Sequence, residues 1–429
     1  MALTGRAALL GALAVLAVFL LGSPAGLVAV NAAVLVVIAV DVALAGSVRA
    51  LRVSRSGATR GRQGVPLEVV LTVVNGGRRT VRAQVRDAWP PSAGSSPRVH
   101  RTLVPPGERR RLPTVLVPTR RGDRRPERVT VRSLGPLGVA CRQGRHVAPW
   151  QVRVLPPFTS RRFLPSRLER LRQVEGQVAS RGAGQGTEFD SLREYVPGDD
   201  VRAIDWRTTA RTQAVAVRTY RPERDRRVVL LLDTGRTSAA RIGDSPRLDF
   251  ALDAGLLLGA LAQRAGDTVD LLAFDAVVRA EVPGGRADVL PRLVDAMALL
   301  EPALVEPDVG RVVAALLARV RRRALVVLFT DLNAAALEEG LLPLLPALTA
   351  RHTVVVAAVA DPDVDSLAQG RGDVDAVYDA AAAERARTSR RRMTTELRRR
   401  GVEVVEAAGP DFPPAVADAY LALKAAGRL

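Results

Sequence analysis

Residues 228–233 read Val-Val-Leu-Leu-Leu-Asp, an apolar run that ends in a carboxylate and leads into the loop Thr234–Ser238. Comparable aliphatic runs occur at 268–274, 278–282, 324–329, 353–359 and 402–406. Stretches with helical periodicity separate most of these runs, at 248–264, 287–300, 309–321, 334–348, 380–400 and 414–425. Fully apolar strands that alternate with helices are typical of a mainly parallel sheet with helices on both faces. Residues 227–429 are therefore predicted to form a doubly wound α/β domain.

A β-rich segment precedes this domain, over residues 64–157. Its short alternating runs, broken by Pro and Gly, lie at 67–74, 80–88, 98–103, 110–117, 128–133 and 147–155. This period of two predicts an antiparallel, sandwich-like domain that acts as a spacer or interaction module. Asn75-Gly76-Gly77 between the first two runs predicts a hairpin turn.

The first 50 residues predict a transmembrane helical hairpin. The run 7–21 is wholly apolar, and the run 25–48 is apolar except for Asn31 and Asp41, with a Gly-Ser-Pro turn at 22–24. Because a span takes about 20 helical residues, the second run is long enough and the first only just. Two spans joined by a tight turn place both ends on the same side of the membrane.

Basic residues flank this hairpin and predict its orientation. Arg6 precedes it, and Arg49, Arg52, Arg55 and Arg60 follow it. The positive-inside bias then places the β-rich and α/β domains in the cytoplasm, at the cell membrane. The competing interpretation is a signal peptide cleaved near Ser23-Pro24-Ala25, which would leave the basic residues on the disfavoured side of the second span.

The amino-acid composition excludes several classes of partner and of chemical site. The net charge of +19 would ordinarily indicate nucleic acid or an anionic membrane surface, but aromatic residues make up only 3% of the chain. Few stacking side chains are available, so we expect no nucleic-acid partner and favour lipid headgroups. Cys141 is the one cysteine, which excludes an intramolecular disulfide, and the three histidines lack ligand-like spacing for zinc.

Residues 158–226 form a linker that begins with an Arg-rich helical stretch at 161–178 and continues into a charged motif. The motif residues are Glu188, Arg193, Tyr195, Pro197, Gly198, Asp199, Asp200, Asp205, Trp206 and Arg211. Alternating charges around two aromatic rings predict a paired polar network that fixes a long loop against a sheet. The alternative is that the Pro-Gly turn followed by two carboxylates offers a site for a cation or a partner.

This motif resembles the signature of the bacterial domain of unknown function 58 family, in which the same series precedes a von Willebrand factor A-like fold. The resemblance extends to the flanking architecture of helical anchor, β-rich middle and α/β domain. It implies a partner, a MoxR-type AAA+ ATPase, with which similar proteins are often associated in gene neighbourhoods. The implied role is that of an adaptor or assembly factor for envelope or metalloprotein maturation.

The same resemblance implies a metal-ion-dependent adhesion site at the carboxyl ends of the strands, where ligands of open α/β sheets bind. Asp233 and Asp331 follow two strands, and Thr237 stands for the second Ser of the family's Asp-x-Ser-x-Ser loop, whereas Gly235 replaces the first. The middle-loop Thr has no clear equivalent, although Glu306 or Asp308 lies in about the right place. We therefore expect Asp233, Thr237 and Asp331 to form a weakened or altered Mg²⁺ site. Alternatively, Asp233 caps the helix or loop that follows it, and Asp331-Leu332-Asn333 caps the next one.

The sequence favours a non-enzymatic, membrane-anchored interaction protein. A Gly-rich phosphate loop with Lys is missing from the sequence, and three histidines do not assemble a Ser-His-Asp arrangement. A second hypothesis is a metal-dependent phosphodiesterase or nuclease that uses Asp199, Asp200, Asp205 and Asp233. A third is an outward-facing adhesion protein, which requires the opposite topology.

Overall fold

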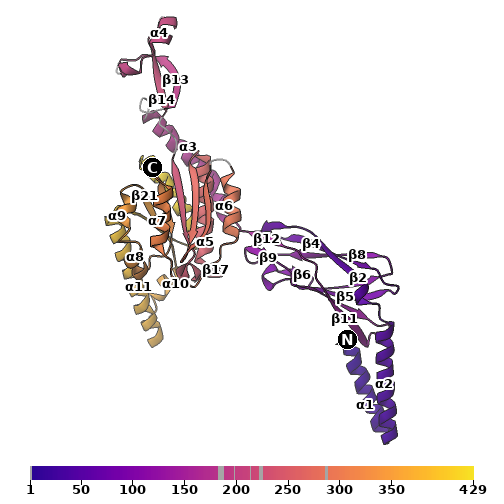
Figure 1. Ribbon diagram of the computed structural model, residues 1–429. Helices are drawn as coiled ribbons and strands as arrows, with labels where there is room; N and C mark the ends of the chain where they lie inside the picture. Colours follow the sequence, from indigo (N-terminus) through magenta and orange to yellow (C-terminus); the bar gives the residue numbers. More distant parts are fainter. Residues whose placement is uncertain (1, 182–187, 198, 213, 222–225, 286–287) are drawn as a thin grey trace. The chain divides into compact units, whose positions relative to one another are not determined.

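The computed structural model describes residues 2–181, 188–197, 199–212, 214–221, 226–285 and 288–429. The chain forms two compact units, Met1–Pro157 and Phe158–Leu429 (Figure 1). The first unit contains the N-terminal helices together with the β-rich segment. The second contains the linker and the α/β domain.

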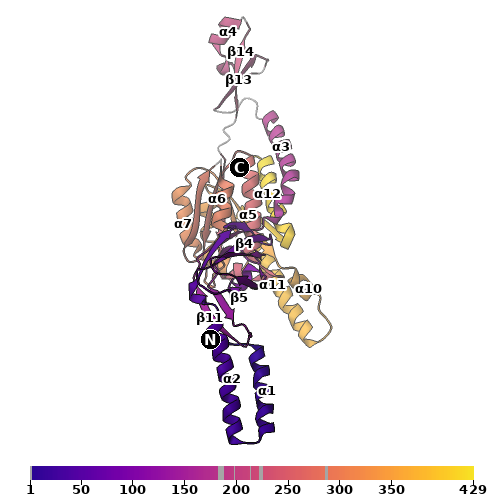
Figure 2. The same cartoon turned by 90° about the vertical axis from the view of Figure 1, so that its right-hand side faces the viewer.

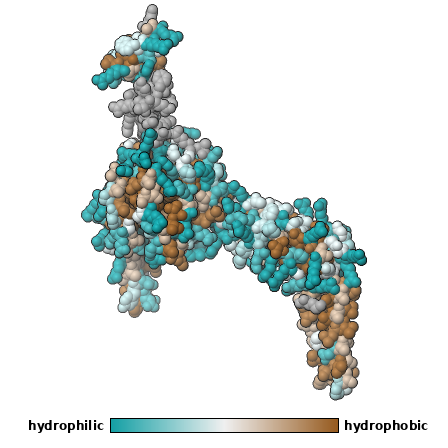
Figure 3. Space-filling view, in the orientation of Figure 1, coloured by the Kyte–Doolittle hydropathy of each residue, from teal (hydrophilic) through white to brown (hydrophobic). Residues whose placement is uncertain are grey.

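Two apolar helices open the first unit. α1 (Gly5–Leu21) and α2 (Pro24–Leu44) lie side by side in both ribbon views (Figures 1 and 2). The stretch Pro24–Ala50 is long and apolar enough to cross a membrane, a test that a signal sequence also passes, whereas α1 has 17 residues. Their apolar side chains face outward, as Figure 3 shows, and Phe19 is 82% exposed. One membrane-competent helix is thus established, and the second span remains a prediction.

Asp41, the acidic residue inside the second apolar run, joins α2 to the β-rich segment. It is fully buried, and its carboxylate accepts hydrogen bonds of 2.8 Å from the amides of Leu137, Val139 and Ala140. The N-terminal end is tied to the same region, because β1 (Ala2–Leu3) pairs with β11 (Ala140–His146). Both ends of the helix pair therefore meet the same edge of the β structure.

Two sheets share the core of the β-rich segment, as the alternating pattern predicts. One has the strand order β1-β11-β10-β5-β7, with β10 at Val129–Leu134, β5 at Val81–Asp87 and β7 at Val99–Val104. The other has the order β2-β4-β8-β6, at Leu51–Gly57, Leu67–Asn75, Arg109–Leu116 and Ser95–Ser96. A short third sheet has the order β3-β12-β9, at Arg60–Arg62, Val152–Leu155 and Gly122–Arg124. Val73 of β4 and Val85 of β5 belong to one buried cluster, so the first two sheets face each other.

The hairpin predicted at Asn75-Gly76-Gly77 is wrong. β4 pairs with β2 and β8, and β5 pairs with β10 and β7, so the chain crosses from one sheet to the other at this turn. Asn75 is buried, and its side-chain amide donates to the carbonyls of Arg79 (2.9 Å) and Val104 (2.8 Å). Asn-Gly chemistry predicts a turn, but which strand the chain joins next depends on long-range contacts such as the bond from Asn75 to Val104.

The second unit is built on a six-stranded, mostly parallel sheet, as predicted. Its order is β19-β18-β15-β20-β21-β22, and only β19 runs antiparallel to its neighbour among these strands. The strands lie at Val278–Gly285, Thr268–Phe274, Arg227–Asp233, Leu325–Phe329, Thr353–Ala360 and Glu403–Ala408. β15 is buried from Val228 to Asp233, since helices cover both of its faces.

The helices divide between the two faces of this sheet. α5 (Arg247–Arg264), α6 (Val289–Ala298) and α12 (Phe412–Ala425) pack together on one face, and α3 (Leu164–Arg181) packs on α5 and α12. The cluster on the other face includes residues of α7 (Val309–Arg319), α8 (Ala334–Gly340), α9 (Leu345–Thr349) and α11 (Val374–Arg399). A further short helix, α10, spans Pro362–Leu367. This arrangement leaves the carboxyl ends of β15 and β20 side by side.

Candidate functional site

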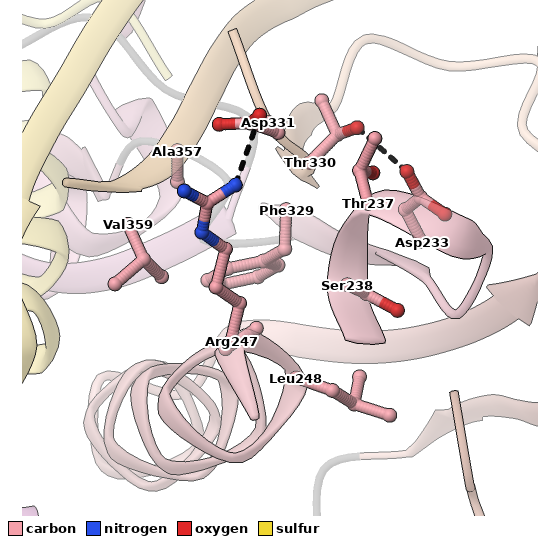
Figure 4. A pocket seen from close by; sticks show the side chains of 11 residues that line it. Asp233, Thr237, Ser238, Arg247, Leu248, Phe329, Thr330, Asp331, Ala357 and Val359 are labelled. Atoms are coloured by element: carbon pink, nitrogen blue, oxygen red, sulfur yellow. Dashed lines mark hydrogen bonds and ion pairs between the residues drawn. The ribbon is translucent and has the colours of Figure 1, made fainter. Parts of the chain in front are cut away.

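The structure brings the three predicted metal ligands to one pocket. Asp233 ends β15, and Asp331 follows the neighbouring strand β20 by two residues. Both line a small pocket with Thr237, Thr330 and Arg247, and Figure 4 shows these side chains around it. The expected convergence of loops at the carboxyl ends of the strands is therefore present.

Asp233 is buried, with both carboxylate oxygens already engaged. It is 2% exposed; Oδ1 accepts from the Gly235 amide and Oδ2 from the Thr330 hydroxyl, each at 2.7 Å. Burial raises the pKa of this carboxyl, and the hydrogen bonds from Thr330 and Gly235 only partly oppose that rise. The bond to Gly235 closes a local turn, in line with the capping alternative.

Asp331 is held between two arginines. Its Oδ1 accepts from Nη2 of Arg390 at 2.9 Å, and its Oδ2 lies 3.0 Å from Nη1 of Arg247. Arg247 is the first residue of α5, and Arg390 lies in α11. The following helix, α8, is capped by Asn333 instead, whose side chain accepts from the Ala336 amide. The cap that the sequence predicts within Asp331-Leu332-Asn333 is therefore supplied by Asn333, while Asp331 pairs with the two arginines.

Two further carboxylates border this pair of arginines. Nε of Arg390 donates to Glu406 at 2.9 Å, and Nη2 of Arg247 lies 3.9 Å from Asp361. The side chains of Arg247 and Arg390 are 14% and 17% exposed, so their charges lie mostly out of solvent. Neither arginine could be predicted from the sequence, because an Arg in an Arg-rich chain gives no local signal of its partner.

The loop after β15 leaves little room at Gly235, the position of the first serine in the adhesion-site pattern Asp-x-Ser-x-Ser. A Cβ at Gly235 would lie 3.0 Å from Oδ1 of Asp233 and 3.0 Å from the carbonyl oxygen of Val305. The residues proposed for the middle loop are used elsewhere: Glu306 pairs with Arg236 at 2.5 Å, and Asp308 caps α7 by accepting from the Arg311 amide. The hydroxyl that Gly235 removes would have little room in this arrangement.

The side chains as placed fit a divalent cation poorly. Mg²⁺ requires several oxygen donors with free lone pairs, in near-octahedral geometry. Here both oxygens of Asp331 face guanidinium N–H groups, and those of Asp233 already accept hydrogen bonds. Among the residues that the structure describes, no group of three or more His, Cys, Asp or Glu side chains could hold a metal ion.

The charged motif forms a small antiparallel structure of its own. β13 (Glu188–Glu194) pairs antiparallel with β14 (Ala216–Arg221), and a short helix, α4 (Trp206–Thr212), lies between them in the chain. We call residues 188–221 the motif hairpin. Of the predicted motif residues, Gly198 lies outside the described residues, and Glu188 is described only as the start of β13.

Ion pairs brace the motif hairpin from within. Arg193 makes a bidentate pair with Asp199 at 2.6 and 2.8 Å, and this hydrogen bonding lowers the pKa of the Asp199 carboxyl. Asp205 accepts from the Thr208 amide at 2.9 Å and from Nε of Arg218 at 2.8 Å, and these bonds lower its pKa likewise. The hydrogen bonds to these two carboxylates thus stabilise turns of the motif hairpin.

Some of the remaining motif residues make hydrogen bonds within the motif hairpin, and others are exposed to solvent. Asp200 accepts from the Arg202 amide at 2.9 Å and so caps a 3₁₀ turn, and the Tyr195 amide donates to the carbonyl of Val215. Pro197 and Arg211 are exposed. Trp206 is 69% exposed, in a hairpin that also exposes Val196 (56%) and Val201 (62%). The motif hairpin therefore exposes apolar side chains to solvent, while ion pairs between its charged side chains stabilise its fold.

Comparison with known proteins finds a family model and several relatives. The model described as "Protein of unknown function DUF58" matches residues 191–407. Proteins Rv1480 of Mycobacterium tuberculosis and Mb1516 of Mycobacterium bovis, both uncharacterized, are each 30% identical over 183 residues, which is 42% of this chain. The match covers 56% of each of these proteins, so the chain spans about half the length of the curated relatives it matches.

Two solved structures match the chain over about a quarter of its length. The CARDB domain of the PF1109 protein from Pyrococcus furiosus is 20% identical, with a TM-score of 0.20 over 26% of this chain and 89% of that one. A Salmonella alpha-2-macroglobulin mutant is 16% identical, with a TM-score of 0.19 over 24% of this chain and 7% of that one. Scores this low carry no argument about fold or function.

Proposed function

The chain belongs to the DUF58 family, and from that premise we propose that it is a non-enzymatic, membrane-anchored protein-interaction module whose partner is a MoxR-type AAA+ ATPase. In this proposal α1 and α2 form a two-span anchor, the β-rich segment is a sandwich-like domain, and the α/β domain is von Willebrand factor A-like. The role is that of an adaptor or assembly factor.

The exposed tryptophan of the motif hairpin carries this proposal. Trp206 is 69% exposed although the residue beside it, Asp205, is buried and ion-paired with Arg218. Exposed apolar side chains on a braced frame are typical of interaction sites, and Trp is enriched among the residues that dominate binding energy. The frame also lowers the entropic cost of binding, because the turn is already ordered.

The carboxylates that a metal-dependent phosphodiesterase would need also favour an interaction protein over an enzyme. Asp199 and Asp205 each pair with an arginine, Asp200 caps a turn, and Asp233 is buried with both oxygens engaged. A two-metal site needs carboxylates that converge on ions about 4 Å apart. Side chains that are used to hold turns favour recognition over hydrolysis.

The proposal is tested by binding of a MoxR-type AAA+ ATPase to the full chain in lipid nanodiscs, measured by biolayer interferometry. We expect Trp206→Ala to weaken binding at least about 30-fold, the effect of losing a residue that dominates an interface. Tyr378→Ala is the matched control, because Tyr378 is also an exposed aromatic residue, at 74%, but lies in α11.

Two results would contradict the proposal. One is a wild-type chain that does not bind the ATPase in either nucleotide state. The other is equal weakening by Trp206→Ala and Tyr378→Ala, since an interface centred on the motif hairpin requires the two variants to differ. Thermal unfolding of each variant checks that the change in binding does not come from loss of the fold.

The cytoplasmic location is a second testable part. Arg49, Arg52, Arg55 and Arg60 follow the apolar helices, and the positive-inside bias keeps such residues in the cytoplasm. A C-terminal epitope tag should therefore resist protease added to intact spheroplasts and be digested after lysis. Digestion from outside would favour the outward-facing adhesion protein instead.

A further inference from the structure

We infer that Arg247 and Arg390 replace the divalent cation at the strand-end pocket, so that this face of the domain works without metal. The adhesion site that the family resemblance implies places a cation beside Asp233 and Asp331. In this chain Asp331 instead receives N–H groups from both arginines, at 3.0 and 2.9 Å.

The charge of the two guanidinium groups supports this assignment. Together they carry the same positive charge as one Mg²⁺ ion, and they lie among the carboxylates of Asp331, Asp361 and Glu406. Arg is the cation best suited to such a place, because its fixed fork of donors satisfies carboxylates and it cannot lose its charge. Partial burial of all these side chains strengthens the attraction.

The arginines also exclude a metal ion. A divalent cation bound at Asp331 would have to displace the N–H donors from its oxygens and break the ion pairs of Asp331 with two partly buried guanidinium groups, which is unfavourable. It would also meet their positive charge at close range. Gly235 contributes no hydroxyl, so the gain from new ligands is small.

The arginines come from different parts of the fold, which makes the replacement specific. Arg247 begins α5 on one face of the sheet, and Arg390 lies in α11, which contributes to the cluster on the other. They meet at Asp331 in the loop after β20. The ion pairs therefore connect both helical layers across the end of the sheet, where a bound metal would connect only the loops.

The inference is tested on the full chain in detergent micelles by Mn²⁺ titration with electron paramagnetic resonance, and by thermal unfolding in EDTA or Mg²⁺. We expect the wild-type chain to leave the Mn²⁺ signal unchanged and to unfold at the same temperature in both buffers. We expect Arg247→Ala/Arg390→Ala to unfold at least about 4 °C lower in EDTA. The same variant should gain Mn²⁺ binding and recover part of the loss in Mg²⁺, because its carboxylates then lack a cation.

Arg319→Ala is the matched control, since Arg319 pairs with Glu281 at 2.8 Å on the surface, away from the pocket. It should neither bind Mn²⁺ nor respond to Mg²⁺. The inference is overturned if the wild-type chain binds Mn²⁺ and loses that binding in Asp331→Asn. It is overturned equally if the folded double variant gains no Mn²⁺ binding. These outcomes concern the pocket alone and do not depend on whether the ATPase binds.

Discussion

At the residue scale, Asp233 combines a functional position with a structural cost. It ends a buried strand at the edge where α/β domains bind ligands, yet its surroundings disfavour the charged form. Burial is the largest cause of the raised pKa, and the nearby charge of Asp331 adds to it. The folded chain therefore holds a proton on this carboxyl at pH values where the unfolded chain has lost it.

This shift gives a pH dependence with a definite sign. Because the folded pKa lies above the usual 3.8, the contribution of Asp233 to the free energy of unfolding falls as pH rises from 3.8 through the raised pKa. Asp233→Asn keeps a group that can accept from Gly235 and interact with Thr330, but it does not titrate. The stability of the variant relative to wild type should thus increase with pH over this window.

Urea-unfolding midpoints of the full chain between about pH 4 and about pH 7 measure this difference. Asp244→Asn is the control, because the Asp244 side chain is fully exposed and lies 3.8 Å from Arg241. A relative stability of Asp233→Asn that stays flat, or that falls with rising pH, would show that Asp233 is ionised in the folded chain without cost.

The two carboxylates of the strand-end pocket could be predicted from the sequence, but the two arginines that pair with Asp331 could not. Asp233 and Asp331 could be placed at one edge, because carboxyl ends of parallel strands coincide. Arg247 lies 14 residues after Asp233 and Arg390 lies 59 residues after Asp331, in helices of opposite layers. Only packing of those helices decides that their guanidinium groups meet one carboxylate.

At the element scale, the motif hairpin depends on side-chain ion pairs more than on a core. Two short strands alone are marginal in water, and here Arg193–Asp199 and Asp205–Arg218 supply the additional bonds. Asp205 is the more buried of the two acids, at 9% exposed. Its removal should therefore affect the hairpin more than removal of the exposed Asp200.

We predict that Asp205→Ala loosens the motif hairpin and leaves the α/β core intact. Loss of the Thr208 cap and the Arg218 pair should raise the rate of limited trypsin cleavage within 193–218 several-fold, because local opening of the hairpin becomes more favourable. Mass spectrometry of early fragments measures this rate. Asp200→Ala is the comparison, and equal acceleration by both variants would refute the special role of Asp205.

Elements were predictable in proportion to their apolar patterning. The run 228–232 became β15 at Arg227–Asp233, and 268–274 became β18 with the same bounds. By contrast β2 and β11 were missed, because Arg, Ser and Gly fill many of their exposed positions. Their strand structure comes from pairing with β4 and β10, which a single-sequence pattern does not reveal.

At the scale of the whole molecule, two compact units imply two unfolding transitions. Gly135→Ala should lower the free energy of unfolding of the first unit alone, by roughly 3 kcal/mol. The added methyl group would overlap the Asp41 carboxylate and break its buried hydrogen bonds. Asp233→Asn should move only the second. Differential scanning calorimetry of the full chain in micelles separates the two, and a single shared transition would contradict this independence.

The bonds from Asp41 to the amides of Leu137, Val139 and Ala140 have a mechanical consequence. They fix the C-terminal end of α2 to the β structure, so we expect the two to rotate together. With α2 in a lipid bilayer, tilting the helix tilts the β structure by the same angle. In a chain anchored by α2, the β structure would then keep a constant height and inclination above the membrane.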